Sequence, residues 1–136
     1  MDSLKTLTIL FRAHKSFVNL IKKDVKKHGL NATEFGVLEV LYHKGPLAIM
    51  DIKDKVLITA SSMSYVIDQL VGKGFIKRIK NEDDKRQFMI KLSALGEDLM
   101  KEIYPKHASF LRSRLNLLEP DEEETLQKLL KKIGKE

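Results

Sequence analysis

Two short segments in which apolar and polar residues alternate constrain the fold of this chain more than any other feature. They are FIKRIK at 75–80 and QFMIKL at 87–92, and alternation with a period of two predicts strands. The residues between them, NEDDKR, predict a hairpin tip that carries five charges. Such a tip is either a solvated turn or a surface that contacts a charged partner. Helical patterns occupy most of the rest, so we expect a mainly α fold with one small β-hairpin.

The longest helical pattern covers residues 4–28. Its apolar positions alternate in spacing between three and four, which places them in one stripe along a single helix. The stripe consists of Leu4, Leu7, Phe11, His14, Val18, Ile21 and Val25. A stripe this long exceeds what a small domain usually needs, so either a partner helix or the chain's own core can cover it.

Start and stop signals then predict the second helix. Gly29 ends the first helix, and Asn31 with Glu34 three residues later predicts a capping box. The second helix is expected to end near Lys44, because Gly45 and a proline follow it.

Four more helices are predicted on both sides of the hairpin. Thr59 and Ser93 are the expected N-caps of two of them. The expected spans are 48–55, 60–72, 94–104 with a continuation past Pro105 by a bend or a break, and a last helix from Pro120. The chain order is therefore four helices, two strands and two helices.

Composition limits the class of protein. The net charge is +6 and the pI about 9.4, and the basic excess lies in residues 1–28 and 51–93, which suits a polyanion partner. The chain has no cysteine, so disulfides, thiolate metal sites and thiol sensing are excluded. No apolar run approaches the roughly 20 residues of a membrane span, and no cleavage site follows the first helix. We expect a cytoplasmic protein with no membrane partner.

A helix, a turn, a second helix and then a hairpin form the layout of a winged helix. In that motif the second helix enters the DNA major groove, which is wide enough for one α-helix. Small polar side chains let the helix approach the bases closely. The candidate DNA-reading residues of this helix are Thr59, Ser61, Ser62, Ser64 and Tyr65. A serine-rich face is also typical of a solvated helix, so this face alone leaves both interpretations open.

Residues 30–100 resemble the MarR family of winged-helix transcriptional regulators. The most specific part is DDKRQFMIKLSALG, in which Asp84 and Arg86 match the family's Asp-x-Arg pair at the wing. An alternating strand, Ser93 and Gly96 follow as in the family. Two positions depart from it: Leu57 stands where a glycine is frequent, and Tyr65 where an arginine is frequent. The operator sequence of a relative therefore cannot be transferred to this chain.

The resemblance implies a homodimer that binds a palindromic operator, with one half-site per subunit. It divides the chain into an N-terminal dimerisation helix at 1–28, a winged helix at 29–93 and C-terminal dimerisation helices at 94–136, all within one compact intertwined domain. The implied interface residues are Leu4, Leu7, Phe11, Leu115, Leu118, Leu126, Leu129 and Ile133.

The resemblance also assigns the charged hairpin tip to the DNA minor groove. Arg86 suits the negative potential of a narrow groove, and Asp84 is expected to hold the tip in shape through Arg86 or the wing backbone. Lys80 and Lys85 are expected near phosphates. The alternative for Asp84 and Arg86 is a surface ion pair without function.

Relatives of this kind commonly release DNA when a small aromatic or phenolic ligand binds, and residues 30–45 are similar to the branch that responds to quinones and related compounds. The candidate pocket residues are Phe11, His14, Phe17, Tyr42 and His43. Aromatic residues on inward helix faces also serve simply as core, so this alternative stays open. Nothing in the sequence indicates a cofactor.

Rival functions have little support in the residues. The four histidines lack the spacing of a helical metal pair, so no metal site is expected. Gly72 and Gly74 end a helix instead of opening one, and no nucleophile with a histidine and carboxylate can be assembled, so we expect no enzyme. A protein-binding adaptor on a winged-helix scaffold remains the alternative function.

Overall fold

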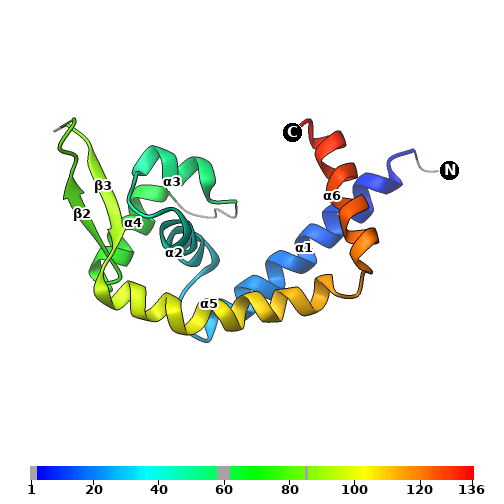
Figure 1. Cartoon of the computed structure of the whole chain (residues 1–136), viewed down its shortest axis with the longest axis horizontal. Coiled ribbons are helices and arrows are strands. Elements are labelled where there is room, and N and C mark those ends of the chain that lie inside the picture. Colours follow the sequence, from blue (N-terminus) through cyan, green and yellow to red (C-terminus); the bar gives the residue numbers. More distant parts are fainter. Residues whose placement is uncertain (1–2, 58–61, 85) are drawn as a thin grey trace. The chain divides into compact units, whose positions relative to one another are not determined.

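The computed structural model describes residues 3–57, 62–84 and 86–136, and the chain divides into two compact units, Met1–Tyr104 and Pro105–Glu136. The elements in chain order are α1 Lys5–Lys26, α2 Ala32–Lys44, β1 Leu47–Ala48, α3 Ile49–Lys55, α4 Met63–Gly72, β2 Ile76–Lys80, β3 Phe88–Leu92, α5 Ala94–Leu115 and α6 Pro120–Gly134 (Figure 1). This confirms the predicted mainly α fold with a hairpin wing. None of the described helices is long and apolar enough to cross a membrane.

The capping signals act as predicted. At the start of α2, the Asn31 Oδ1 accepts from the Glu34 backbone N–H at 2.8 Å, and the Glu34 Oε1 accepts from the Asn31 N–H at 3.0 Å. Gly29 and Gly45 take positive φ angles of 72° and 79°, which glycine adopts without steric strain. At the start of α5, the Ser93 Oγ accepts from the Gly96 N–H at 3.1 Å.

Two local predictions need correction. Helix α4 begins at Met63, later than the predicted residue 60, because Ser62 has a non-helical ψ of 132° and its carbonyl accepts the first helical bond, from Val66. Thr59, the predicted cap, lies outside the described residues. Helix α5 runs through Pro105 to Leu115 without a break.

A third strand was missed by the sequence analysis. Strand β1 pairs antiparallel with β3 through Leu47 opposite Ile90 and Ala48 opposite Met89, which gives the sheet order β1-β3-β2. Two residues are too short to show alternation, so only the pairing with β3 defines this strand. Each strand of the hairpin begins one residue later than predicted, and β2 pairs with β3 from Ile76 opposite Leu92 to Lys80 opposite Phe88.

The core of the first unit surrounds α2, which contacts α1, α3, α4 and β3. Apolar residues from every one of these elements and from the start of α5 are buried together. The largest fully buried side chains are Leu38, Ile52, Ile67, Leu70, Ile90, Met100, Val25, Val37 and Val66. In α2, Phe35, Leu38 and Leu41 are buried and Tyr42 is only partly buried, and α4 buries Met63, Val66, Ile67 and Leu70.

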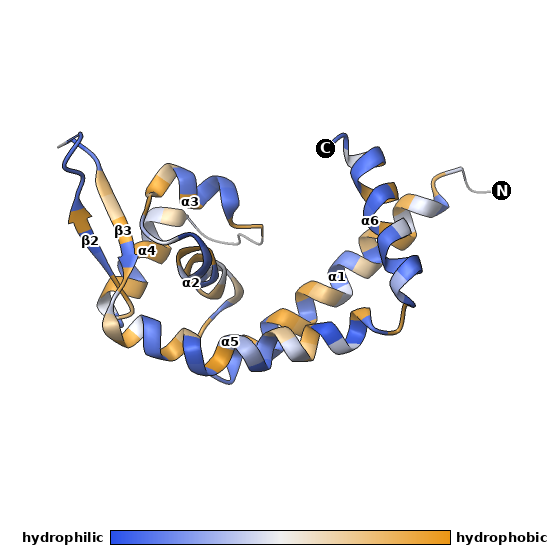
Figure 2. Cartoon of the chain, viewed as in Figure 1, coloured by the Kyte–Doolittle hydropathy of each residue, from blue (hydrophilic) through white to orange (hydrophobic). Residues whose placement is uncertain are grey.

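The apolar stripes of α1 and α6 remain largely uncovered in the single chain. Leu4 and Phe11 are 60% and 63% exposed, and Val25 is the one described residue of α1 that is buried. Helix α6 has no buried residue, and Leu126, Leu129 and Ile133 are all exposed. Figure 2 shows apolar positions alternating with polar ones along both helices. The chain's own core therefore does not cover the first half of the α1 stripe.

Candidate DNA-binding surface

Helix α4 has one buried face and one exposed face. Met63, Val66, Ile67 and Leu70 point into the core, where α4 packs on α2 and α3. The exposed residues of the helix and its N-cap are Ser62, Ser64, Tyr65, Asp68, Gln69 and Gly72. Three of the five predicted DNA-reading residues thus lie on the solvent side, and the other two, Thr59 and Ser61, lie outside the described residues.

The end of α4 is anchored to the corner between α1 and α2. The Lys73 Nζ, just after α4, donates to the Glu34 Oε2 at 2.7 Å and to the Gly29 carbonyl at 3.1 Å. The Glu34 side chain is only 5% exposed, so water screens this ion pair little. One carboxylate therefore caps α2 with one oxygen and holds the end of α4 with the other.

A second ion pair ties the exposed face of α4 to the wing. Arg78 of β2 donates to the carboxylate of Asp68, and β2 lies against α4. Both side chains are largely solvated, so the pair contributes about 0–1 kcal/mol to stability. Its clearer consequence is that the single acidic side chain of α4 is neutralised by a cation from the sheet.

The described residues at the tip of the wing bond to one another. The Asn81 N–H donates to the Gln87 carbonyl at 3.2 Å, and the Asp83 N–H donates to the Asn81 Oδ1 at 3.0 Å. The Asp84 Oδ1 accepts from the Arg86 N–H at 3.1 Å and from the Arg86 Nε at 3.4 Å. Asp84 therefore makes both of the contacts predicted for it.

The cations at the wing face solvent. The Arg86 side chain is 91% exposed, since Asp84 holds its backbone and Nε and leaves the rest of the guanidinium outward. Lys80, at the end of β2, is also exposed. Lys85 lies outside the described residues. An exposed guanidinium can enter a narrow groove, where the negative potential is concentrated.

The predicted pocket residues separate into two groups. Tyr42 and His43 at the end of α2 contact Tyr104 of α5, with ring centroids 5.8 Å and 4.7 Å from the Tyr104 ring. Burial, followed by the nearby Glu39 carboxylate, raises the pKa of the Tyr104 phenol. Phe11 and His14 lie exposed on α1, and Phe17 is partly buried.

Several functional candidates in the structure were not found from the sequence. No local pattern marks these residues, because their partners lie far away in the sequence. Lys73 bonds to Glu34, 39 positions away, and Arg78 to Asp68, 10 positions away. The Tyr104 ring contacts the ring of His43, 61 positions away. Within the described ranges, no group of three or more histidine, aspartate or glutamate side chains is placed to hold a metal ion.

Comparison with known proteins places this surface in a family. Residues 30–88 match the model of the MarR family. The chain is 37% identical over 132 residues to the HTH-type transcriptional regulator MhqR of Bacillus subtilis, with 97% of this chain and 91% of the relative covered. The chain belongs to the MarR family. A second relative, the uncharacterised HTH-type transcriptional regulator YkoM of Bacillus subtilis, is 39% identical over 93% of this chain and 82% of its own length.

Solved structures confirm the MarR fold. AbsC, a MarR-family transcriptional regulator from Streptomyces coelicolor, superposes with a TM-score of 0.88 at 21% identity, covering 99% of this chain and 94% of AbsC. A mutant of MarR from E. coli, complexed with operator DNA, gives a TM-score of 0.83 at 22% identity and covers 98% of this chain and 99% of that one. The chain is thus a DNA-binding transcriptional regulator of the MarR family with a winged helix-turn-helix.

Proposed function

We propose that this protein is a repressor that binds a palindromic operator as a homodimer and is released by a small aromatic or phenolic ligand. The observation that carries the proposal is the ordered wing with an outward Arg86, joined through Arg78 and Asp68 to an exposed polar face of α4. These two surfaces come from one packed unit, so they can meet neighbouring grooves of one half-site.

The uncovered apolar faces support the homodimer. Leu4, Leu7 and Phe11 on α1 and Leu126, Leu129 and Ile133 on α6 are all at least 39% exposed. Exposed apolar stripes along two helices typically mark an interface, because burying them removes apolar surface from water. Leu115 and Leu118, the other predicted interface residues, are partly buried in the single chain.

The aromatic contacts of Tyr42, His43 and Tyr104 support a ligand of the aromatic class. A planar phenol or quinone can stack on such rings, and the hydroxyls and imidazole can bond its oxygens. Similarity to MhqR fits the branch that residues 30–45 indicate. Phe11, His14 and Phe17 stay predicted pocket residues of the dimer. We propose further that the protein acts in the cytoplasm, without cofactor, metal or catalytic activity.

The test is a titration of the purified protein on the intergenic DNA upstream of its own gene, against salt, with random duplex as competitor. A palindromic segment should bind orders of magnitude more tightly than random DNA. Arg86→Ala should remove most of this affinity, whereas Lys80→Ala should weaken all sequences alike and lower the salt slope by about one.

The same titration separates the repressor from the adaptor. Equal and weak binding to both duplexes, with a steep salt slope, would show only the effect of the basic charge. Specific binding that survives Arg86→Ala unchanged would contradict the role of the wing. Release of the operator complex by catechol or benzoquinone, and not by cyclohexanol, would support the proposed ligand class.

A further inference from the structure

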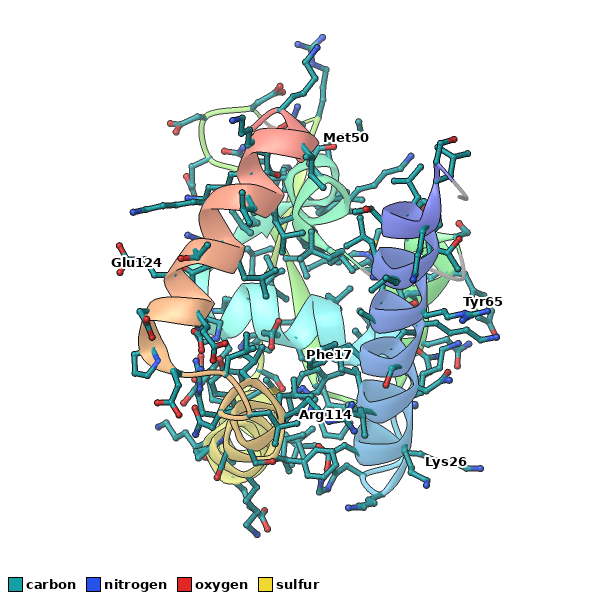
Figure 3. All side chains as sticks on the ribbon, turned by 90° about the vertical axis from the view of Figure 1, so that its right-hand side faces the viewer. Phe17, Lys26, Met50, Tyr65, Arg114 and Glu124 are labelled. Carbon is teal, nitrogen blue, oxygen red and sulfur yellow. The ribbon has the colours of Figure 1, made fainter. Side chains whose placement is uncertain are left out.

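We propose that Tyr65 is a specificity-determining residue that reads the 5-methyl group of a thymine at one position in each half-site. The inference rests on the proposed DNA-binding function and names the chemistry by which α4 selects its operator. Tyr65 projects outward from the helix (Figure 3), and its side chain is 58% exposed, whereas every other large apolar residue of α4 is buried or half-buried.

Tyr65 has no structural task among the described residues. Within the described ranges its hydroxyl has no hydrogen-bond partner and its ring stacks on no other ring. A phenol ring without an internal partner on the DNA-facing side of the helix is therefore available for an external one.

Among the other exposed side chains of α4, Gln69 lies one turn after Tyr65 and suits adenine, to which an amide can bond twice. None of the others offers an apolar surface for a base. Helix α4 contains no lysine or arginine, so the usual bidentate contact with guanine cannot come from this helix. The Asp68 carboxylate, which could accept from cytosine, already accepts from Arg78. The Ser64 hydroxyl both donates and accepts, so by itself it bonds to any base.

Thymine differs from the other bases in the major groove by an apolar group, its 5-methyl. An aromatic ring edge can bury that methyl, and burial of one methyl-sized group changes a binding constant by about fourfold. With two half-sites in a palindrome, the combined change is about fifteenfold. The serines beside Tyr65 are small enough to let its ring reach the floor of the groove.

The experiment replaces thymine with deoxyuridine, which removes only the methyl. An operator is first defined by selection from random duplexes, and each thymine pair related by the dyad is then replaced in turn. Affinities are measured for the wild type, Tyr65→Ala and Tyr65→Phe. Thermal unfolding of each variant checks the fold, which an exposed position should leave unchanged.

At one pair of thymines related by the dyad, replacement with deoxyuridine should lower the affinity of the wild-type protein for the operator by about fifteenfold. The Tyr65→Phe variant should show the same loss, because it keeps the aromatic ring. Tyr65→Ala should bind the two duplexes alike. A tight operator that tolerates deoxyuridine everywhere, or a methyl effect that persists in Tyr65→Ala, would overturn the inference and leave the repressor intact. Absence of any selected operator would overturn the proposed function itself.

Discussion

The winged-helix core and the outer helices differ in how their apolar residues are covered. Around α2, side chains such as Leu38, Ile67 and Ile90 are completely buried within the chain. Helix α6 and the first half of α1 expose apolar residues at the same helical spacing, and Leu129 is 54% exposed. The first region buries its apolar residues within the chain, whereas the second leaves an apolar face exposed, which fits the proposed homodimer.

The largest effect should come from a charge on the uncovered face of α6. Leu129→Glu is expected to raise the dimer dissociation constant by about 1,000-fold or more, because a dimer would bury two unpaired carboxylates. Sedimentation equilibrium measures the constant, and Gln127→Glu on the same helix is the control with an equal charge change. If both variants dimerise like the wild type, this face of α6 is not the interface.

The next effect tests how tightly the first region is packed. A Cβ at Gly96 would lie 2.0 Å from the Phe75 carbonyl oxygen, which itself accepts from the Ser93 N–H. Gly96→Ala should therefore lower the free energy of unfolding by about 3 kcal/mol, since backbone must move.

The matched control is Gly72→Ala at the last residue of α4, because a Cβ added at Gly72 would have no neighbouring atom of another part of the chain within 4 Å. Alanine there should be neutral or stabilise by up to about 1 kcal/mol. Urea unfolding measures both variants. Equal stabilities would show that the start of α5 does not need the close approach to Phe75.

A smaller effect is expected from the ion pair between the buried Glu34 carboxylate and Lys73 at the end of α4. Glu34→Gln keeps an acceptor for the Asn31 N–H but leaves Lys73 without its charged partner, which should cost about 1–3 kcal/mol in unfolding free energy. Glu124→Gln removes one partner of an exposed pair with Lys128 and should cost less than about 0.5 kcal/mol. If the Glu34→Gln and Glu124→Gln variants lose equal unfolding free energy, burial of the Glu34 carboxylate does not strengthen its ion pair with Lys73.

The smallest effect is a pH dependence from Tyr104. Its pKa is raised in the folded state by burial and by Glu39, so the neutral phenol stabilises the fold below the ordinary value of 10.0, and this contribution is lost as pH rises further. As the pH rises above about 10, Tyr104→Phe should lose less stability than the wild type, because it has no phenol to ionise. Identical alkaline unfolding curves would rule out this contribution.

Local patterns in the sequence determined the elements and their ends. The interacting groups are close in the sequence in the capping box of Asn31 and Glu34 and in the contact of Asp84 with Arg86, where they lie three and two positions apart. The end of α2 at Gly45 depends on the φ angle of that one residue. The alternating strands also require no distant information to be recognised. Such features can be predicted because the atoms that make them are held close by the chain itself.

Only the tertiary structure decided which distant groups meet. Strand β1 exists because Leu47 reaches Ile90, the anchor of α4 joins Lys73 to Glu34 39 positions earlier, and Arg78 neutralises Asp68 across from the sheet. In each case the sequence shows an ordinary lysine, arginine or leucine with many possible neighbours. Packing of the elements around α2 brings these groups together, because a close-packed core leaves few arrangements of the backbone.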